Sequence, residues 1–212
     1  MTTRGAGKSG TETRIRIRRK TAEEHYTQGV QLRASGDLAG AIAAWTRAID
    51  TDPESAPAYT SRGRARRETG DLEGALADFT KALELNPKDA AAYASRAVVR
   101  REKRDLDGAL EDCDQVIRIE PESAAAYHYR ATVRRAREDY DGAIADCSCA
   151  IHLNPGFVNA YVERGLAREC AGDLAGAKAD YGKSIEIQLR EALSSGKVLK
   201  DMSLDELGGS RG

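Results

Sequence analysis

The feature of this sequence that most constrains its fold is an internal repeat of 34 residues. Positions one period apart carry glycine or alanine, alanine, or aspartate five times in succession. The ladders are Gly29, Gly63, Ala97, Ala131 and Gly165; Ala41, Ala75, Ala109, Ala143 and Ala177; and Asp37, Asp71, Asp105, Asp139 and Asp173. Interlocked ladders of one period predict five equivalent units, at about residues 22–55, 56–89, 90–123, 124–157 and 158–189.

Each unit carries the apolar pattern of two helices. In the second unit, Leu72, Leu76, Phe79 and Leu83 recur at intervals of three and four and so share one helical face. The segment TGD at residues 69–71 precedes this helix: glycine suits a left-handed helix end, and aspartate accepts hydrogen bonds from the amides that begin the next helix. Prolines end the second helices, at Pro53, Pro87, Pro121 and Pro155. The sequence therefore predicts an all-α fold of five antiparallel helix hairpins.

The N-terminal limit of the array follows from a helix cap. Thr21 and Glu24 form a capping box, so we expect the array to occupy residues 21–193 and residues 1–20 to be a disordered basic tail. Residues suited to cap later first helices are Ser55, Asp89 and Ser123.

The C-terminal limit follows from a loss of pattern. Leu189 stands where a proline would close the fifth unit, so the last helix is expected to run to about Leu193. Residues 194–212 are then a C-terminal tail, and a capping box at residues 203–206 predicts a short helical cap. Since a solenoid must cover its terminal faces, either apolar residues near this end shield it or the end docks a partner or a second copy.

These features resemble the tetratricopeptide repeat. The first helix has a small residue or glycine, the second has alanine, a bulky residue and alanine, and a proline closes a 34-residue period. The match covers residues 22–189 and lacks only the last proline. The resemblance implies a right-handed superhelical α-solenoid whose first helices line a concave groove, and it implies that the groove holds a peptide or another protein.

Pairs of arginines four residues apart recur on the first helices of units two to five, and an aspartate recurs on the second helices of the same units. The first unit has Gln28, Leu32 and Ala44 there, so the arginines and the acid are absent together. We therefore hypothesise a structural ion-pair ladder in which each aspartate accepts hydrogen bonds from the arginines of its own unit; contact with a ligand is the alternative. Its members are Arg62, Arg66, Asp78, Arg96, Arg100, Asp112, Arg130, Arg134, Asp146, Arg164, Arg168 and Asp180.

A second set of residues is expected to face the groove if the family geometry holds, with a solvated charged face as the alternative interpretation. Its members are Tyr26, Arg33, Thr60, Arg64, Arg67, Ser95, Arg101, His128 and Arg135. Guanidinium groups bind carboxylates in bidentate fashion, so an acidic peptide is the expected partner. One subset of the family holds chaperone C-termini with a clamp of lysine and asparagine, but the places of that clamp hold Tyr26, Val30, Ser61 and Ala91 here, which argues against that mode.

The basic N-terminal segment supports an alternative function. Residues 1–20 carry seven lysines or arginines and one glutamate, although the whole chain has a net charge of −1. Binding of nucleic acid or an anionic surface through this tail and the groove arginines is the alternative, and a solvated tail is the simpler interpretation. The sequence GAGKSG at residues 5–10 lacks the first glycine of a phosphate-binding loop, because Thr2 stands there.

The remaining motifs argue against an enzyme. The histidines and the four cysteines lack metal-ligand spacing, and we expect no catalytic residue, no metal and no cofactor. Cys113 and Cys147 take the place of aromatic residues in other units and are expected to act as small core residues. The N-terminus lacks the apolar run of a secretory signal, and no apolar stretch is long enough to cross a bilayer, so we expect a cytoplasmic protein. The oligomeric state stays open.

Overall fold

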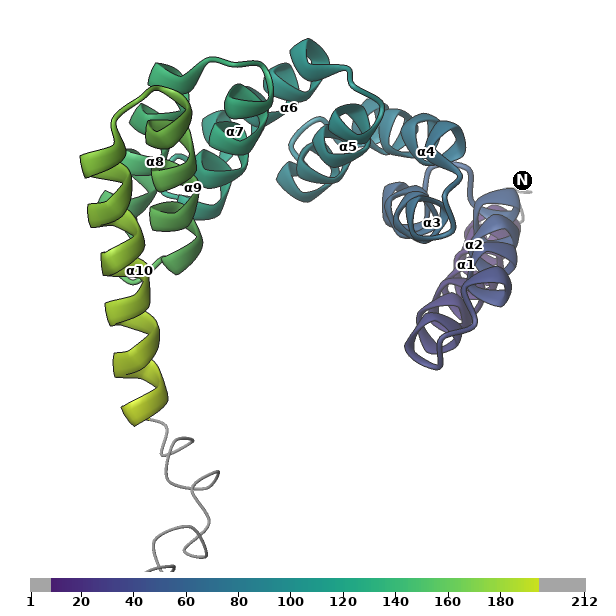
Figure 1. Cartoon of the computed structure of the whole chain (residues 1–212). Helices are drawn as coiled ribbons and strands as arrows, with labels where there is room; N and C mark the ends of the chain where they lie inside the picture. The colour runs from purple at the N-terminus through teal and green to yellow at the C-terminus, as the bar shows by residue number, and fades with distance from the viewer. Residues whose placement is uncertain (1–8, 195–212) are drawn as a thin grey trace, which may run out of the picture. The chain divides into compact units, whose positions relative to one another are not determined.

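The computed structural model describes the backbone of residues 9–194 and the side chains of residues 21–194. This part of the chain consists of helices and turns and contains no strand (Figure 1). Its helices are α1 (Ser9–Ala34), α2 (Leu38–Thr51), α3 (Ala56–Glu68), α4 (Leu72–Leu85), α5 (Ala90–Glu102), α6 (Leu106–Ile119), α7 (Ala124–Ala136), α8 (Tyr140–Leu153), α9 (Val158–Cys170) and α10 (Leu174–Ser194). The predicted all-α fold class is confirmed.

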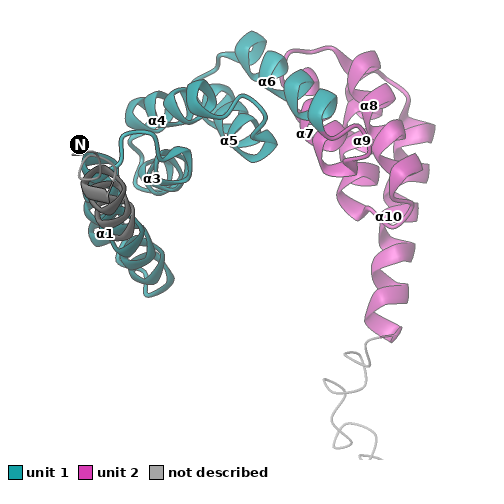
Figure 2. Cartoon of the chain, turned by 180° about the vertical axis from the view of Figure 1, so that it is seen from behind, with its two compact units in different colours: residues 1–119 teal, residues 120–212 magenta. Residues whose placement is uncertain are grey.

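The chain forms two compact units, residues 1–119 and residues 120–212 (Figure 2). In unit 1, α1 packs against α2, α3 against α4 and α5 against α6, and contacts of α2 with α3 and of α4 with α5 join the three hairpins. In unit 2, α7 packs against α8 and α9 against α10, and α8 contacts α9. Each unit is therefore a stack of helix hairpins in chain order.

The turn inside each hairpin combines a left-handed residue with an aspartate cap. Gly36, Gly70 and Gly172 have φ angles of 86°, 85° and 87°, which glycine adopts without steric cost. Arg104 and Glu138 hold the equivalent places with φ angles of 65° and 66°, so these two hairpins form the same turn with a strained residue. In all five hairpins the recurring aspartate accepts a hydrogen bond from the amide three residues later, at 2.8–3.0 Å.

The first helices begin differently from the prediction in three places. Ser55 and Ser123 precede α3 and α7, but their hydroxyls make no capping hydrogen bond, whereas the carboxylate of Asp89 caps α5 by accepting from the amide of Ala92 at 2.9 Å. A charged carboxylate is the stronger acceptor at this position.

Thr21 does not begin the first helix, because α1 already begins at Ser9. Residues 11–20 contain no glycine or proline that would end a helix there. Residues 1–8 of the expected tail lie outside the described residues.

The core matches a small residue on each first helix to the size of its partner on the second helix. A Cβ atom on Gly29 would lie 2.5 Å from Trp45, and one on Gly165 would lie 2.5 Å from Tyr181, so an aromatic partner requires glycine. Gly63 is close to Phe79 in the same way, at 3.0 Å. Where the partner is cysteine, the small residue is alanine: Ala131 and Cys147 share one buried cluster, and Ala97 and Cys113 hold the equivalent places. The two cysteines thus act as small core residues.

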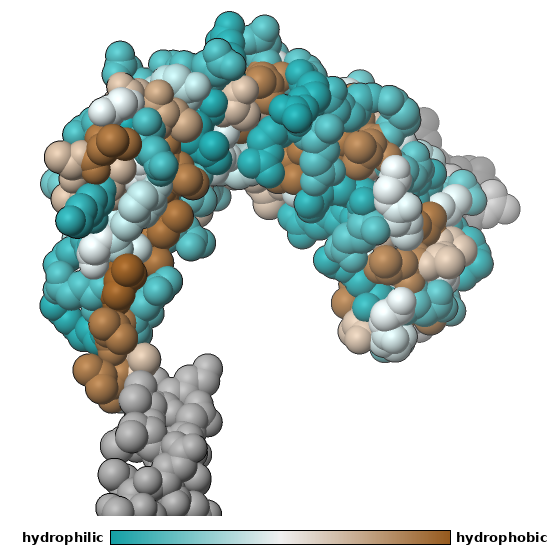
Figure 3. Space-filling view, in the orientation of Figure 1, coloured by the Kyte–Doolittle hydropathy of each residue, from teal (hydrophilic) through white to brown (hydrophobic). Residues whose placement is uncertain are grey.

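The last described helix leaves an apolar stripe exposed. Leu174, Ile185, Leu189 and Leu193 of α10 are 54–69% exposed, and Figure 3 shows apolar residues along the end of this helix. The position equivalent to Ile185 is covered in the second hairpin, where the following first helix packs over the side chain of Leu83. Residues 195–212, with the predicted tail and its cap, lie outside the described residues.

Candidate functional site

The four aspartates of the predicted ladder are buried and each accepts from two arginines. Asp112 is 1% exposed, and the others are each 3% exposed. In the second hairpin, Arg62 binds Asp78 in bidentate fashion, with Nε donating at 2.9 Å and Nη2 at 2.7 Å. The same two-atom contact recurs at Arg96, Arg130 and Arg164.

The second arginine of each pair closes the hairpin turn. Arg66 donates from Nη1 to Asp78 at 2.9 Å and to the carbonyl oxygen of Gly74 at 3.4 Å. Its Nε atom lies 3.5 Å from the capping Asp71. One guanidinium therefore contacts the buried carboxylate, the first turn of the second helix and the cap of that helix. Equivalent contacts are made by Arg100, Arg134 and Arg168.

The first arginine of three of these pairs also reaches the preceding hairpin. Arg62 donates from Nη1 to the hydroxyl of Thr46 at 3.1 Å, and Arg96 donates to Thr80 at 3.3 Å. In unit 2, Arg164 donates to the hydroxyl of Ser148 at 3.1 Å. Each of these three arginines also lies over the ring of the tyrosine three residues earlier in the sequence. The distance from the arginine Cζ atom to the centroid of the tyrosine ring is 5.6 Å in all three cases. We propose that the ladder is structural, since its donors are directed at groups within the protein.

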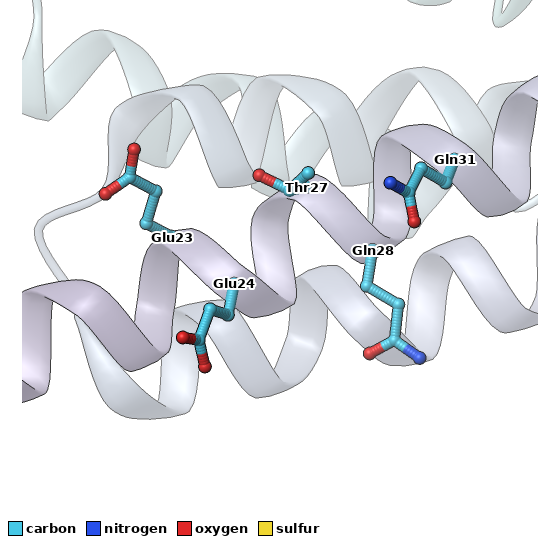
Figure 4. Close-up of a pocket in the computed structure, with 5 residues that line it drawn as sticks. All are labelled: Glu23, Glu24, Thr27, Gln28 and Gln31. Carbon is cyan, nitrogen blue, oxygen red and sulfur yellow. The ribbon is translucent and has the colours of Figure 1, made fainter.

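The first hairpin lacks the ladder, since Gln28, Leu32 and Ala44 stand at its positions. The face of α1 that corresponds to the contact face of later first helices carries Glu23, Glu24, Thr27, Gln28 and Gln31, all exposed. These five side chains line a surface pocket on α1 alone (Figure 4). Ala58 and Arg62, one period after Glu24 and Gln28, pack on α2 instead. The pocket is thus the polar end face of the first hairpin.

The surface formed by α1, α3 and α5, here called the first-helix surface of unit 1, holds most of the residues predicted for the groove. Hydrogen bonds join its helices: Ser61 and Tyr26 interact through their hydroxyls at 3.4 Å, and the Nε atom of Arg64 donates to the hydroxyl of Ser95 at 3.3 Å. Thr60 also lies on α3, but it is 7% exposed, and its hydroxyl oxygen has no hydrogen-bond partner among the described residues. Thr60 is therefore covered rather than open to a ligand.

Two of the predicted groove arginines are paired with glutamates of the following hairpin. Arg33 lies 2.5 Å from Glu68, and Arg67 lies 2.9 Å from Glu102. These are exposed pairs that join successive first helices. Arg101 holds the next equivalent place and is half-buried on α5.

The corresponding surface of unit 2 contains a buried carboxylate that the sequence analysis missed. Glu163 of α9 is 7% exposed and accepts from the Nε atom of Arg135 on α7 at 2.5 Å. The place of Glu68 and Glu102 is taken by Cys170 in this hairpin, so Arg135 pairs with a different acid. That substitution was the available signal. The hydrogen bond with Glu163 raises the pKa of Arg135.

His128 lies on the same surface of unit 2. Its ring packs against Phe157 with centroids 5.0 Å apart. Burial lowers the pKa of His128, and the negative charge of Glu163 opposes that shift.

A comparison with protein families gives a match to the tetratricopeptide repeat at residues 26–90, 60–124 and 97–156. The chain belongs to the tetratricopeptide repeat family. The three matched segments together cover more than half of the chain and extend from the first hairpin to the fourth. Membership confirms the resemblance found in the sequence.

Solved tetratricopeptide repeat structures share the fold. The crystal structure of MamA is 26% identical, with a TM-score of 0.73, and the match covers 77% of this chain and 96% of that one. The crystal structure of YrrB, described as a TPR protein with an unusual peptide-binding site, is 19% identical with a TM-score of 0.69 over 90% of this chain and 98% of that one. The first TPR of Spaghetti (RPAP3), bound to the HSP90 peptide SRMEEVD, is 24% identical with a TM-score of 0.54 over 56% of this chain and 94% of that one. The search of curated proteins gives no match.

The described residues show no other kind of site. Across residues 21–194, no group of three or more histidine, cysteine, aspartate or glutamate side chains is arranged to hold a metal ion. None of the helices described is long and apolar enough to span a membrane. The GAGKSG segment lies outside the part of the chain whose side chains the structure describes.

Proposed function

We propose that this protein is a non-enzymatic interaction scaffold that binds an extended peptide or a partner helix on the first-helix surfaces of its hairpins. The observation that carries the proposal is that the arginines of the first helices fall into two sets with different surroundings. Those on the packing face are committed to buried aspartates and neighbouring hairpins, whereas those on the first-helix surface lie among exposed or half-buried side chains. The repeated first helices share one backbone conformation and differ in their surface side chains, and such a surface is suited to recognise a segment of a partner.

Two structural neighbours support this function. YrrB is a TPR protein with an unusual peptide-binding site, and the Spaghetti (RPAP3) domain was solved with a bound peptide. Both are below 25% identity, so they support the fold and the general mode, and they leave the partner of this protein undefined. An enzyme would need a catalytic constellation, and the contacts described above are structural.

A photo-crosslinking amino acid placed at Val30 tests the proposal. Val30 lies on α1 in the first-helix surface and is 46% exposed, and Glu111 on the second helix α6 has a side chain that is 78% exposed and serves as the control position. We expect partner crosslinks from position 30 in cells and none from position 111. Equal crosslinking from the two positions, or crosslinking from position 111 alone, would contradict the proposal.

Nucleic-acid binding is less well supported by the contacts. Arg33, Arg67 and Arg135 are paired with carboxylates of this chain, so their charge is already compensated. The side chains of residues 1–20 lie outside the description, so binding by the basic tail stays a prediction. Filter binding by the full chain and by a chain beginning at Thr21, at two salt concentrations, separates this function from the scaffold.

A further inference from the structure

One arginine of the first-helix surface of unit 1 differs from the others in its partners. Arg33 and Arg67 each pair with a glutamate, but Arg64 contacts a hydroxyl, that of Ser95, through Nε. Among residues 21–194, no carboxylate lies within ion-pair distance of Arg64. A guanidinium has five N–H donors, and the four on the terminal nitrogens of Arg64 have no partner in the described part of the chain. The half-buried side chain therefore carries an uncompensated charge.

The surroundings of Arg64 hold this charge in one place. The hydroxyl of Ser95 donates to the carbonyl oxygen of Ala91 at 2.7 Å, so its lone pair is free to accept from Arg64 and to fix the guanidinium. The neighbouring pairs of Arg33 with Glu68 and of Arg67 with Glu102 are each neutral, whereas Arg64 has no carboxylate partner among residues 21–194. A ligand group that reaches Arg64 therefore meets a positive charge.

Apolar side chains hold the equivalent places on the flanking helices. Val30 on α1 lies one period before Arg64 and is 46% exposed, and Val98 on α5 lies one period after it and is half-buried. Single exposed apolar residues are ordinary, but two valines in register with a charge between them match an extended segment that carries an apolar, an acidic and an apolar side chain at every second residue, because successive side chains of an extended chain point to opposite faces.

We propose that Arg64 anchors a carboxylate of the bound peptide, with apolar peptide side chains on Val30 and Val98. The proposal rests on the proposed function and names its partner class: an extended peptide whose aspartate, glutamate or terminal carboxylate binds the guanidinium in bidentate fashion. The bound carboxylate takes the place that glutamates of this chain take at Arg33 and Arg67. A single charge-assisted contact of this kind predicts weak binding by a short peptide.

A chemical-shift titration of the ¹⁵N-labelled full chain tests the anchor, because this method detects weak binding and locates it. The probes are acetyl-Val-Gly-Glu-Gly-Val-amide, its glutamine counterpart, and acetyl-Val-Val with a free C-terminal carboxylate. We expect one or both acidic probes to shift the Arg64 Nε–H and the Ser95 amide signals, and the glutamine probe to bind at least about tenfold more weakly. The acidic probe that binds identifies the source of the carboxylate.

Matched variants separate the anchor from general charge. Arg64→Gln is expected to weaken binding of the acidic probe by at least about tenfold. The double variant Lys81→Gln with Glu84→Gln removes an exposed pair on the second helix α4 without changing the net charge, and it is expected to bind within about twofold of the natural protein. Binding of neither acidic probe at Arg64, or equal binding by Arg64→Gln, overturns the anchor. Partner crosslinks from position 30 that persist in Arg64→Gln would show that the anchor fails while the scaffold function stands.

Discussion

The Nη1 atom of Arg62 donates a hydrogen bond to the hydroxyl of Thr46, 3.1 Å away on the preceding hairpin, while Nε and Nη2 hold the buried Asp78. One side chain thus couples the closure of its own hairpin to its stacking on the hairpin before. Repeat arrays are stable as a sum of such units and interfaces, so a contact that serves both contributes to cooperativity.

Loss of the hydroxyl at Thr46 should weaken the stacking. We expect Thr46→Val to lower the free energy of unfolding by about 1 kcal/mol, because one donor of the half-buried Arg62 loses its partner. A double-mutant cycle with Arg62→Gln, measured by urea denaturation, should show a coupling of about 0.5–1 kcal/mol between the two residues. Additive effects of the two substitutions would contradict the coupling.

Removal of a ladder carboxylate should lower the free energy of unfolding more than loss of the Thr46 hydroxyl does. Asp112 is 1% exposed and accepts from both Arg96 and Arg100, whose side chains are 14% and 21% exposed. We expect Asp112→Asn to destabilise the protein by about 3 kcal/mol, since two partly buried guanidinium groups lose their counter-charge. Glu111→Gln, at a neighbouring position with a 78% exposed side chain, is the control and should change the stability little. Absence of coupling between Arg100 and Asp112 in a double-mutant cycle would show that the ladder does not stabilise the fold.

The size match between the two helices of a hairpin predicts a compensating pair of substitutions. Cys113→Phe alone should cost about 1–3 kcal/mol, because Ala97 occupies the space that Gly63 leaves for Phe79. Cys113→Phe combined with Ala97→Gly should recover most of that loss. Thermal unfolding of the two single variants and the double variant checks this, and a double variant no more stable than Cys113→Phe would refute the size match.

The strained turn residues offer a route to higher stability. Arg104 has a φ angle of 65°, in the region that glycine tolerates, so Arg104→Gly should raise the stability by about 1 kcal/mol. Lys103, the preceding residue, has a φ angle of −81°, and Lys103→Gly should instead lower it by about 0.5–1 kcal/mol. If backbone strain decides the effect, urea denaturation should show that the free energy of unfolding rises in Arg104→Gly and falls in Lys103→Gly.

The half-buried His128 should make stability depend on pH. Its pKa is lowered in the folded state, so below about pH 6.5 the unfolded chain binds a proton more readily than the folded one. The contribution of His128 to stability is therefore full above pH 6.5, falls as the pH drops toward the lowered pKa, and is constant below it. We expect His128→Asn to reduce the loss of stability between pH 7 and pH 5, whereas substitution of the exposed His152 should leave it unchanged. An identical pH profile for His128→Asn would rule out this linkage.

One part of the candidate site, the ion-pair ladder, was predictable from the sequence. The position of each ladder arginine follows from the period, and the structure places each of them beside the aspartate of its own hairpin. Contacts between hairpins were not predictable. The hydroxyl partner of Arg62, the buried Glu163 and the covered hydroxyl of Thr60 all depend on how one hairpin is rotated against the next.

The sequence by itself determined the hairpins, their order and their turns, because helix periodicity, aspartate caps and prolines act over a few residues. Only the tertiary structure decided which arginines of the first helices are neutralised. Arg33 and Arg64 belong to the same predicted set, yet one meets a glutamate 35 residues away and the other meets a serine 31 residues away. That difference comes from the angle and separation of adjacent helices, which are set by packing of side chains distant in sequence.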